Sequence, residues 1–260
     1  MHKNSAIQDI LTQYKEGKIS SAAAEEQLSG LRLDHMGDIA CLDLGRSVRC
    51  GMPEVILAEG KDPDHLLEIA ARFANSAGRC VISRLSPEQA ARIEELASVN
   101  GLDVDYRKAG NIMVLMKDRT IHPPKRGGKV AIITAGTSDI RVAEEAKLIA
   151  EEMGCDVKSA YDVGAAGIHR LFPALKDLLD AKVYIVCAGR EGTLPTVIAG
   201  LVDKPVIGVP VSTGYGYMGQ GRAALASMLQ SCSVIGVVNI DAGFTAGALA
   251  ARIANLGVAP

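Results

Sequence analysis

The sequence predicts an α/β protein, in which a flavodoxin-like, doubly wound parallel sheet follows a smaller α/β domain. Short apolar runs alternate with helical segments from residue 129 onward, and those runs are apolar throughout rather than alternating with polar residues. Such runs are typical of parallel strands that helices cover on both faces. Strand-helix alternation in turn requires right-handed crossovers between parallel strands. Five strands account for the second half of the chain.

The domain boundary is predicted from composition. A chain of 260 residues suits two modest domains. The stretch IHPPKRGGK contains two prolines and two glycines, which interrupt both helix and strand patterns. We therefore expect an N-terminal α/β domain at residues 1–120, a linker at 121–128 and a second domain at 129–260.

Helical spacing and apolar runs predict the elements of the first half. Ser86, followed by Pro87 and Glu88, is a good helix start because serine caps the free amides and proline fits the first turn. The expected helices are Ile7–Tyr14, Ser20–Leu28, Pro63–Ala77 and Ser86–Ala97, and the expected strands are Glu54–Ala58, Cys80–Leu85 and Asn111–Met116.

In the second half the same criteria predict strands and helices in turn. The strand-like runs are KVAIITAG, DVKSAYDVG, KVYIVCAG, PVIGVPV and IGVVNI. The intervening helices are expected at Asp139–Met153, Ile168–Leu179, LPTVIAGLV, Gly221–Leu229 and Ala246–Asn255.

Composition excludes several classes of function. A formal charge of −2 with scattered lysines and arginines gives no basic surface for nucleic acid or an anionic membrane. The N-terminus lacks the apolar core of a signal peptide, and no apolar run reaches the roughly 18 to 20 residues that span a bilayer. The six cysteines have neither CxxC nor zinc-ligand spacing. We expect a cytoplasmic protein with reduced thiols.

Loops rich in small and functional residues follow the predicted strands of the second half. In a parallel sheet, ligands bind at the carboxyl ends of the strands near the point where strand order reverses. Although one glycine-rich turn is a weak signal, five on one edge favour a small-molecule site. The loops are AGTSD from Ala135, DVGAAGIHR from Asp162, AGREGTLP from Ala188, VPVSTGYGYMGQG from Val209 and NIDAGF from Asn239.

Two of these loops resemble the PurE family of aminoimidazole ribonucleotide carboxylases and mutases. That family has a GSxSD turn after its first strand and a later AGxxxxLPxxxAG segment, which match residues 135–139 and 188–200 here. The PurE family also carries a SAHR segment with a histidine needed for its chemistry. This chain has Ala160-Tyr161-Asp162-Val163-Gly164 instead, which argues against a role in purine biosynthesis.

The whole chain resembles the LarB family, in which a PurE-like domain follows a family-specific N-terminal region. The resemblance spans roughly Leu33 to Gly247 and includes LDLGRSVRCGMPEVILAEGK, AGREGTLP and SCSVIGVVNIDAGF. It implies carboxylation of the pyridinium ring of nicotinic acid adenine dinucleotide with CO2, and cleavage of its phosphoanhydride to release AMP. The implied product is pyridinium-3,5-biscarboxylic acid mononucleotide, an early intermediate of the nickel-pincer cofactor.

Given that substrate, the chemistry requires a nucleophile and a base. Pyridinium carbon 5 is electron-poor, but a thiolate that adds to carbon 4 makes the ring an enamine able to attack CO2. A carboxylate then removes the carbon 5 proton so that the thiolate can leave. We assign these roles to Cys232 and Glu191, although which ring carbon the sulfur attacks is left open. No organic cofactor is needed because the ring is its own electron sink, and Mg²⁺ is compatible with the phosphoanhydride cleavage.

Substrate-binding residues are expected in the same loops. Hydroxyl groups and the amides that open a helix can hold a phosphate or carboxylate, and glycines allow close approach to the backbone. His169 and Arg170 are candidates for phosphate contacts or for assisting hydrolysis. The predicted binding residues are Gly136, Thr137, Ser138, Asp139, His169, Arg170, Gly189, Gly192, Ser212, Thr213 and Gly214.

Structural alternatives stand beside these assignments. Cys232 could be a small buried hydrophobe, and Glu191 and Asp139 could favour helix N-termini without touching substrate. Arg46, Arg49 and Glu54 fit either the adenylate end of the substrate or a structural ion-pair network. The other five cysteines, Cys41, Cys50, Cys80, Cys155 and Cys187, are expected to be structural.

Two rival functions are considered, and an oligomeric assembly is predicted. A PurE-type reaction on aminoimidazole ribonucleotide is one rival, and a non-catalytic nucleotide-binding module is another. The small residues of Ala246–Ala251 can pack closely against another surface. Because PurE relatives assemble as octamers, the resemblance implies a homo-octamer.

Overall fold

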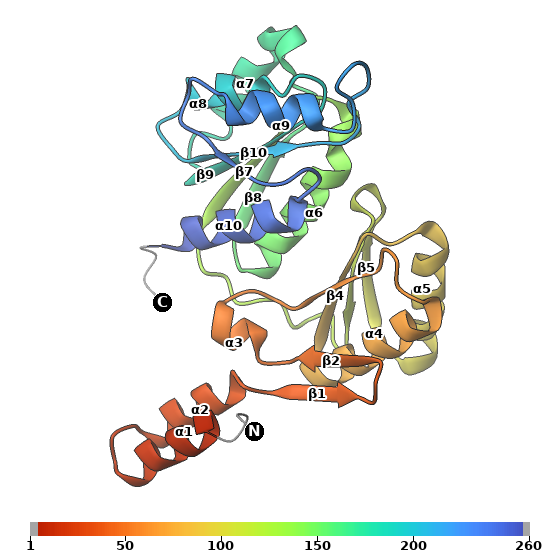
Figure 1. Ribbon diagram of the computed structural model, residues 1–260, viewed down its shortest axis with the longest axis vertical. Coiled ribbons are helices and arrows are strands. Elements are labelled where there is room, and N and C mark those ends of the chain that lie inside the picture. Colours follow the sequence, from red (N-terminus) through yellow and green to blue (C-terminus); the bar gives the residue numbers. More distant parts are fainter. Residues whose placement is uncertain (1–4, 257–260) are drawn as a thin grey trace. The chain divides into compact units, whose positions relative to one another are not determined.

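The computed structural model describes residues 5–256 and divides into two compact units (Figure 1). The first unit holds residues 1–105 and 113–120, and the second holds residues 106–112 and 121–260. The short segment 106–112 thus groups with the second unit rather than with its flanking residues. No helix among residues 5–256 is long and apolar enough to cross a membrane.

The first unit combines a small mixed sheet with helices. In this sheet β3 and β4 run parallel, whereas β4 and β6 run antiparallel. In sheet order its strands are β3 (Val55–Leu57), β4 (Arg79–Ser83), β6 (Ile112–Met116) and β5 (Asp103–Arg107). The hairpin is formed by β1 (Leu33–Met36) and β2 (Ala40–Asp43), and the helices are α1 (Ser5–Lys15), α2 (Ser21–Ser29), α3 (Arg46–Cys50), α4 (Pro63–Ala77) and α5 (Pro87–Asn100).

Local sequence signals account for the two longer helices of this unit. The side chain of Asp62 accepts hydrogen bonds from the first amides of α4, and Ser86 and Gln89 form a reciprocal capping box at the start of α5. Gly78 and Gly101 end these helices in the left-handed conformation that glycine adopts without strain. The predicted starts and ends of both helices are confirmed to within three residues.

The second unit contains the predicted parallel sheet. Its strands lie in the order β11-β10-β9-β7-β8, and each neighbouring pair is parallel. In chain order of the unit this is the 2-1-3-4-5 arrangement of a flavodoxin-like fold, which confirms the expected fold class. The strands are β7 (Lys129–Thr134), β8 (Asp156–Ala160), β9 (Val183–Ala188), β10 (Val206–Pro210) and β11 (Gly236–Val237).

Helices cover both faces of this sheet (Figure 1). One face, which includes Ile133, Tyr184 and Val186, packs against three helices in a continuous buried cluster. These helices are α7 (Leu171–Lys176), α8 (Leu194–Ala199) and α9 (Arg222–Leu229). The other face packs against α6 (Ile140–Glu152) and α10 (Gly243–Asn255). Burial on both faces explains why the strand sequences are apolar throughout.

Helices α6 and α10 approach each other backbone to backbone. A Cβ built on Gly243 would lie 2.4 Å from the carbonyl oxygen of Val142, and one built on Gly247 would lie 2.4 Å from that of Ala146. Only glycine fits such contacts. The small residues of α10 are thus buried largely within their own chain, so they do not support oligomerisation as the sequence analysis supposed.

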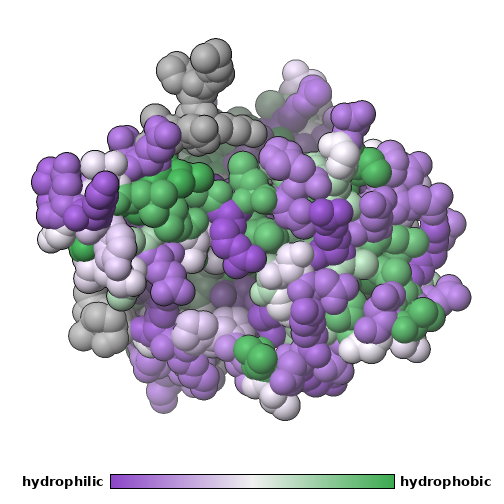
Figure 2. Space-filling view, turned by 90° about the horizontal axis from the view of Figure 1, so that it is seen from below, coloured by the Kyte–Doolittle hydropathy of each residue, from purple (hydrophilic) through white to green (hydrophobic). Residues whose placement is uncertain are grey.

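Several elements differ from the prediction, and neither α3 nor β5 was expected. The helix expected at Ile168–Leu179 is a 3₁₀ segment, η3 (Ala165–Arg170), followed by the short α7. Only two residues of IGVVNI form β11, and the hairpin β1–β2 was not predicted because its strands have only four residues each. On the face seen in Figure 2, hydrophobic residues form separate patches among predominantly hydrophilic ones.

Candidate active site

A cavity of about 440 Å³ lies at the carboxyl edge of the parallel sheet. It adjoins the gap between β7 and β9, where the strand order reverses and where ligands bind in such folds. Four of the five predicted loops contribute to it. The lining residues are Ala135, Gly136, Ser138, Asp139, Gly164, Ala165, Ala166, Ala188, Gly189, Arg190, Glu191, Gly192, Thr193, Leu194, Thr213, Gly214 and Tyr215.

Asp139 is the buried carboxylate of this cavity, with only 3% of its surface exposed. The backbone N–H of Gly136 donates to Oδ2 at 2.9 Å, and the hydroxyl of Thr213 donates to Oδ1 at 3.4 Å. Burial raises the pKa of Asp139 despite these hydrogen bonds, which act in the opposite direction. Asp139 thus joins the loop after β7 to the loop after β10.

Glu191 lines the same cavity but is exposed. No hydrogen bond or ion pair engages its carboxylate within residues 5–256. Its neighbour Gly192 has φ +66°, and a Cβ there would lie 2.7 Å from the carbonyl oxygen of Ala224. The glycine lets this turn sit tightly against α9. A carboxylate held by such a turn, with no partner of its own, is able to accept a proton from a ligand.

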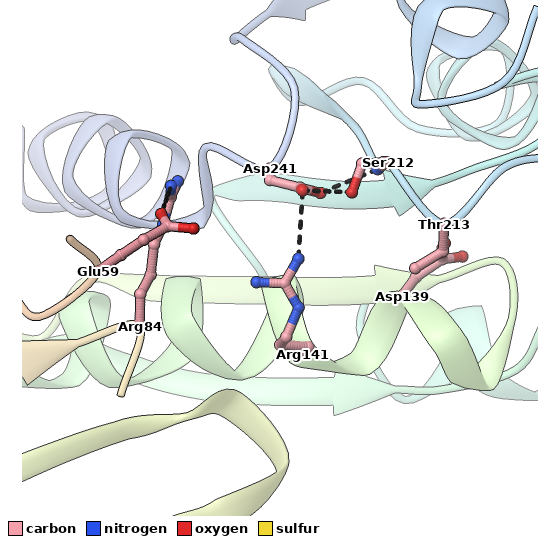
Figure 3. A network of polar contacts seen from close by, with 7 residues as sticks. All are labelled: Glu59, Arg84, Asp139, Arg141, Ser212, Thr213 and Asp241. Carbon is pink, nitrogen blue, oxygen red and sulfur yellow. Dashed lines mark hydrogen bonds and ion pairs between the residues drawn. The ribbon is translucent and has the colours of Figure 1, made fainter. Parts of the chain in front are cut away.

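A polar network fixes the loop after β10 (Figure 3). The carboxylate of Asp241 accepts from the backbone N–H of Ser212 at 2.9 Å and from the Ser212 hydroxyl. Arg141 on α6 donates to the same carboxylate at 3.2 Å. Asp241 has φ +55°, an uncommon conformation for a residue other than glycine. Ser212 therefore anchors the loop rather than lining the cavity, while Thr213 and Gly214 line it.

Three other predicted binding residues lie outside the cavity lining. Thr137 is exposed in the 3₁₀ turn η2 (Thr137–Asp139), next to the lining residue Ser138. His169 and Arg170 are exposed in η3, and Arg170 forms an ion pair with Asp162 at 2.6 Å. Within one chain the cavity therefore does not include the GIHR segment.

Cys232 is exposed, which rules out the alternative of a buried small hydrophobe. It lies beyond the end of α9 and precedes β11, whereas the cavity residues follow their strands. Because the strands are parallel, the thiol belongs to the opposite edge of the sheet from Glu191. The structure does not place the predicted nucleophile and base together within one chain.

The other two cysteines of the second unit are poor nucleophiles. Cys187 is fully buried in β9 and Cys155 is buried beside α10. Burial raises the pKa of Cys155 to about 11 and raises the pKa of Cys187 well above its ordinary value. In the described part of this unit, Cys232 is the only exposed thiol.

Within residues 5–256, no three His, Cys, Asp or Glu side chains gather as a metal site. The carboxylates that line the cavity are those of Asp139 and Glu191. A metal bound here would need ligands from the substrate as well, as Mg²⁺ commonly does with phosphates.

The N-terminal motif GRSVRCGMPE forms ion pairs in the structure. Arg46 donates to Glu54 at 2.8 Å, and Arg49 pairs with Asp43 and donates to the carbonyl oxygen of Gly30 at 2.6 Å. These contacts fit the structural alternative for the motif. Elsewhere in this unit Arg84 pairs with Glu59 at 2.9 Å (Figure 3).

Several lining residues were not predicted from the sequence, and two of them, Arg190 and Tyr215, contact each other. The Arg190 guanidinium lies over the Tyr215 ring, 4.4 Å from its centroid. Arg190 stands between Gly189 and Glu191 in the motif already singled out, so a cation in that loop was a usable signal. Its contact with Tyr215 depends on how two separate loops meet, which spacing along the chain does not reveal.

Comparisons with known proteins identify the family. The model of the AIR carboxylase family matches residues 129–259, and that of the LarB/PurE-like N-terminal domain matches residues 33–117. The chain belongs to the LarB family. The AIR carboxylase match places the cavity of this LarB-family chain within its PurE-like domain.

Individual relatives match either nearly the whole chain or only about half of it. An uncharacterized protein of Methanocaldococcus jannaschii is 41% identical over 265 residues, which cover 98% of this chain and 99% of that protein. The N5-carboxyaminoimidazole ribonucleotide mutase of the same organism is 36% identical over 132 residues, 49% of this chain and 79% of that protein. The corresponding mutase of Thermotoga maritima is 32% identical over 136 residues, 49% of this chain and 75% of that protein. The similarity to mutases is confined to about half of this LarB-family chain.

Proposed function

We propose that this chain carboxylates the pyridinium ring of nicotinic acid adenine dinucleotide and cleaves the phosphoanhydride to release AMP. The product would be pyridinium-3,5-biscarboxylic acid mononucleotide, at the first step of nickel-pincer cofactor biosynthesis. Membership of the LarB family supports this reaction. The observation that carries it is the carboxylate of Glu191, which lines the cavity at the sheet edge without a partner among the described residues.

In the proposed reaction the ring gains and then loses a bond to sulfur. The Cys232 thiolate adds to carbon 4, and the ring nitrogen takes up the electron pair as a neutral dihydropyridine. Carbon 5 of this enamine then attacks CO2 and forms the new carbon–carbon bond. Glu191 removes the proton from carbon 5, and the returning electrons expel the thiolate and restore the aromatic ring.

The placement of Cys232 makes a second copy of the chain part of the proposal. The thiol precedes β11 while Glu191 follows β9, so a neighbouring subunit would have to present its Cys232 to this cavity. Apolar residues around Cys232 support such an interface, because Val234 is 96% exposed and Leu229 is 67% exposed. The assembly proposed for this contact is the homo-octamer implied by the PurE resemblance.

Mixing two inactive variants tests the shared site. Cys232→Ala and Glu191→Gln proteins are each expected to be inactive, but hybrids formed by dissociating and reassembling both would regain activity at about a quarter of their sites. The control is the Cys232→Ala protein alone, dissociated and reassembled in the same way, which is expected to stay inactive. Failure of the hybrids to recover, with assembly confirmed by light scattering, would contradict a site shared between copies.

Product analysis tests the reaction itself. The purified protein is incubated with nicotinic acid adenine dinucleotide and ¹³C-bicarbonate, with and without Mg²⁺, and the products are identified by mass spectrometry. Labelled biscarboxylated mononucleotide together with AMP supports the proposal. Formation of AMP that depends on Mg²⁺ would assign the cation to phosphoanhydride cleavage. Binding without either product would favour a non-catalytic module.

A PurE-type reaction is the second candidate, because the AIR carboxylase match covers residues 129–259. Against it, Tyr161 and Asp162 stand where the PurE resemblance requires the catalytic histidine segment. Tyr161 donates its hydroxyl to Glu144, and the His169 side chain lies outside the cavity lining. A parallel incubation with aminoimidazole ribonucleotide would give a carboxylated imidazole if this candidate were correct.

A further inference from the structure

Arg190 and Tyr215 form a pair at the wall of the cavity. Arg190 belongs to the loop after β9 and Tyr215 to the loop after β10, and both line the cavity. The guanidinium carbon lies over the tyrosine ring, 4.4 Å from its centroid. Stacking of this kind holds a guanidinium by its face and leaves the N–H donors at its edge available.

The charge of Arg190 is not neutralised by a neighbouring side chain. No carboxylate pairs with it in the part of the chain that the structure describes. By contrast, Arg141 is paired with Asp241, and Arg170 is paired with Asp162. A side chain with an available charge in a cavity wall is suited to binding an anion.

The two loops hold the pair in place through their backbones. Arg190 has φ +29°, and a Cβ built on Gly214 would lie 2.9 Å from the backbone nitrogen of Arg190. Glycine at 214 thus allows the loops to touch directly. Gly189 also lies close to a neighbouring loop, since a Cβ there would be 3.3 Å from Oδ1 of Asp139. The guanidinium is therefore presented at a defined position relative to the buried carboxyl group.

The charged residues of the cavity wall are one cation and two carboxyl groups, Arg190, Asp139 and Glu191. We propose that Arg190, held by Tyr215, binds the phosphate of a zwitterionic nucleotide while the carboxyl groups face its cationic ring. The identity of the ring rests on the proposed function, but the phosphate contact does not. The cavity would thus select a nucleotide with a positive ring and a negative phosphate.

Affinities for matched pairs of ligands test this inference. Calorimetry would compare nicotinic acid mononucleotide with its riboside, which lacks only the phosphate. The protein is expected to prefer the mononucleotide by roughly ten- to a hundredfold, as for a charge-assisted contact. Arg190→Gln should remove that preference and leave the affinity for the riboside unchanged, while Arg190→Lys should retain part of it.

Arg222→Gln serves as the matched control. Arg222 is the first residue of α9, is exposed and lies outside the cavity lining. Its substitution removes one positive charge close to the same loops, so it reports any general effect of net charge. We expect Arg222→Gln to keep the phosphate preference of the unmodified protein.

Two results would overturn the assignment of Arg190. One is a phosphate preference that survives in Arg190→Gln, and the other is an effect on nicotinate against nicotinamide mononucleotide instead, which would place the guanidinium at the ring carboxylate. Repeating the comparison with aminoimidazole ribonucleotide and its riboside separates this inference from the proposed reaction. If the protein binds the imidazole pair but not the pyridinium pair, and the phosphate preference for the imidazole pair is lost in Arg190→Gln, the phosphate contact is upheld and the pyridinium ring is contradicted.

Discussion

Charged side chains are used differently in the two units of the molecule. In the first unit several arginines are paired with carboxylates, as Arg72 is with Asp34 at 2.6 Å. At the cavity of the second unit, Glu191 and Arg190 have no such partners within the described residues. Paired surface charges contribute little beyond local order, whereas unpaired charges in a cavity are free to act on a ligand. Unpaired charges in a cavity wall, unlike paired surface charges, are therefore the candidates for contact with a ligand.

Removing an unpaired carboxylate should have the largest effect. Glu191→Gln keeps the shape of the side chain but cannot accept the ring proton, so we expect ring carboxylation to fall by about 10²- to 10⁴-fold. Asp64→Asn is the matched control, since Asp64 is 84% exposed and paired with Arg92 at 2.6 Å. Rates of ¹³C incorporation measure both variants. Equal losses in the two proteins would remove the distinction between paired and unpaired carboxylates.

Asp139 should make stability depend on pH in a direction opposite to that of an ion-paired carboxylate. Burial raises its pKa in the folded state above the ordinary value of 3.8. The folded protein therefore binds this proton more tightly than the unfolded chain, and stability falls as pH rises from about 3.8 through the raised pKa. Asp139→Asn cannot titrate and should lack this fall.

Urea unfolding of both proteins across that pH range measures the effect of Asp139. The difference in free energy of unfolding should change between pH 3.8 and the folded pKa and stay constant above it. A difference that is the same at every pH would show that Asp139 titrates alike in the folded and unfolded states.

The loops that form the candidate site were predictable from the sequence because one rule places them. Loops at the carboxyl ends of parallel strands meet at one edge, and Gly136, Asp139, Glu191 and Thr213 were found in that way. The rule fails for Cys232, because it precedes a strand instead of following one. Only the proposed second copy of the chain would bring this thiol to the cavity. The stacking of Arg190 on Tyr215 escaped prediction because it arises only where two loops fold against each other.

Breaking a partly buried ion pair should have a smaller effect than either change at the cavity. The side chains of Arg46 and Glu54 are 33% and 25% exposed and lie 2.8 Å apart. A double-mutant cycle with Arg46→Gln and Glu54→Gln should give a coupling of about 1 kcal/mol or less in the free energy of unfolding. A coupling near zero, with carboxylation reduced, would instead assign this pair to substrate.

The smallest effect is expected at Asp180, which accepts from Lys129 at 2.9 Å and from Lys158 at 3.1 Å. These lysines lower the pKa of Asp180 to about 2. Its contribution to stability is thus present above pH 3.8 and lost as pH falls toward 2. Asp180→Asn should slightly lower the midpoint of thermal unfolding at pH 7 and leave it unchanged near pH 2. A shift that persists at low pH would point to a cause other than charge.

The most direct test of the proposed chemistry is peptide mass spectrometry of the Glu191→Gln protein after incubation with nicotinic acid adenine dinucleotide and bicarbonate. Without the base, the ring should remain bonded to sulfur, because the thiolate leaves only after the carbon 5 proton is removed. We predict a mass increase that corresponds to the substrate on the peptide containing Cys232 and on no other cysteine. This mechanism would be contradicted if Cys232 stayed unmodified in the Glu191→Gln protein and the Cys232→Ala variant still formed the biscarboxylated product.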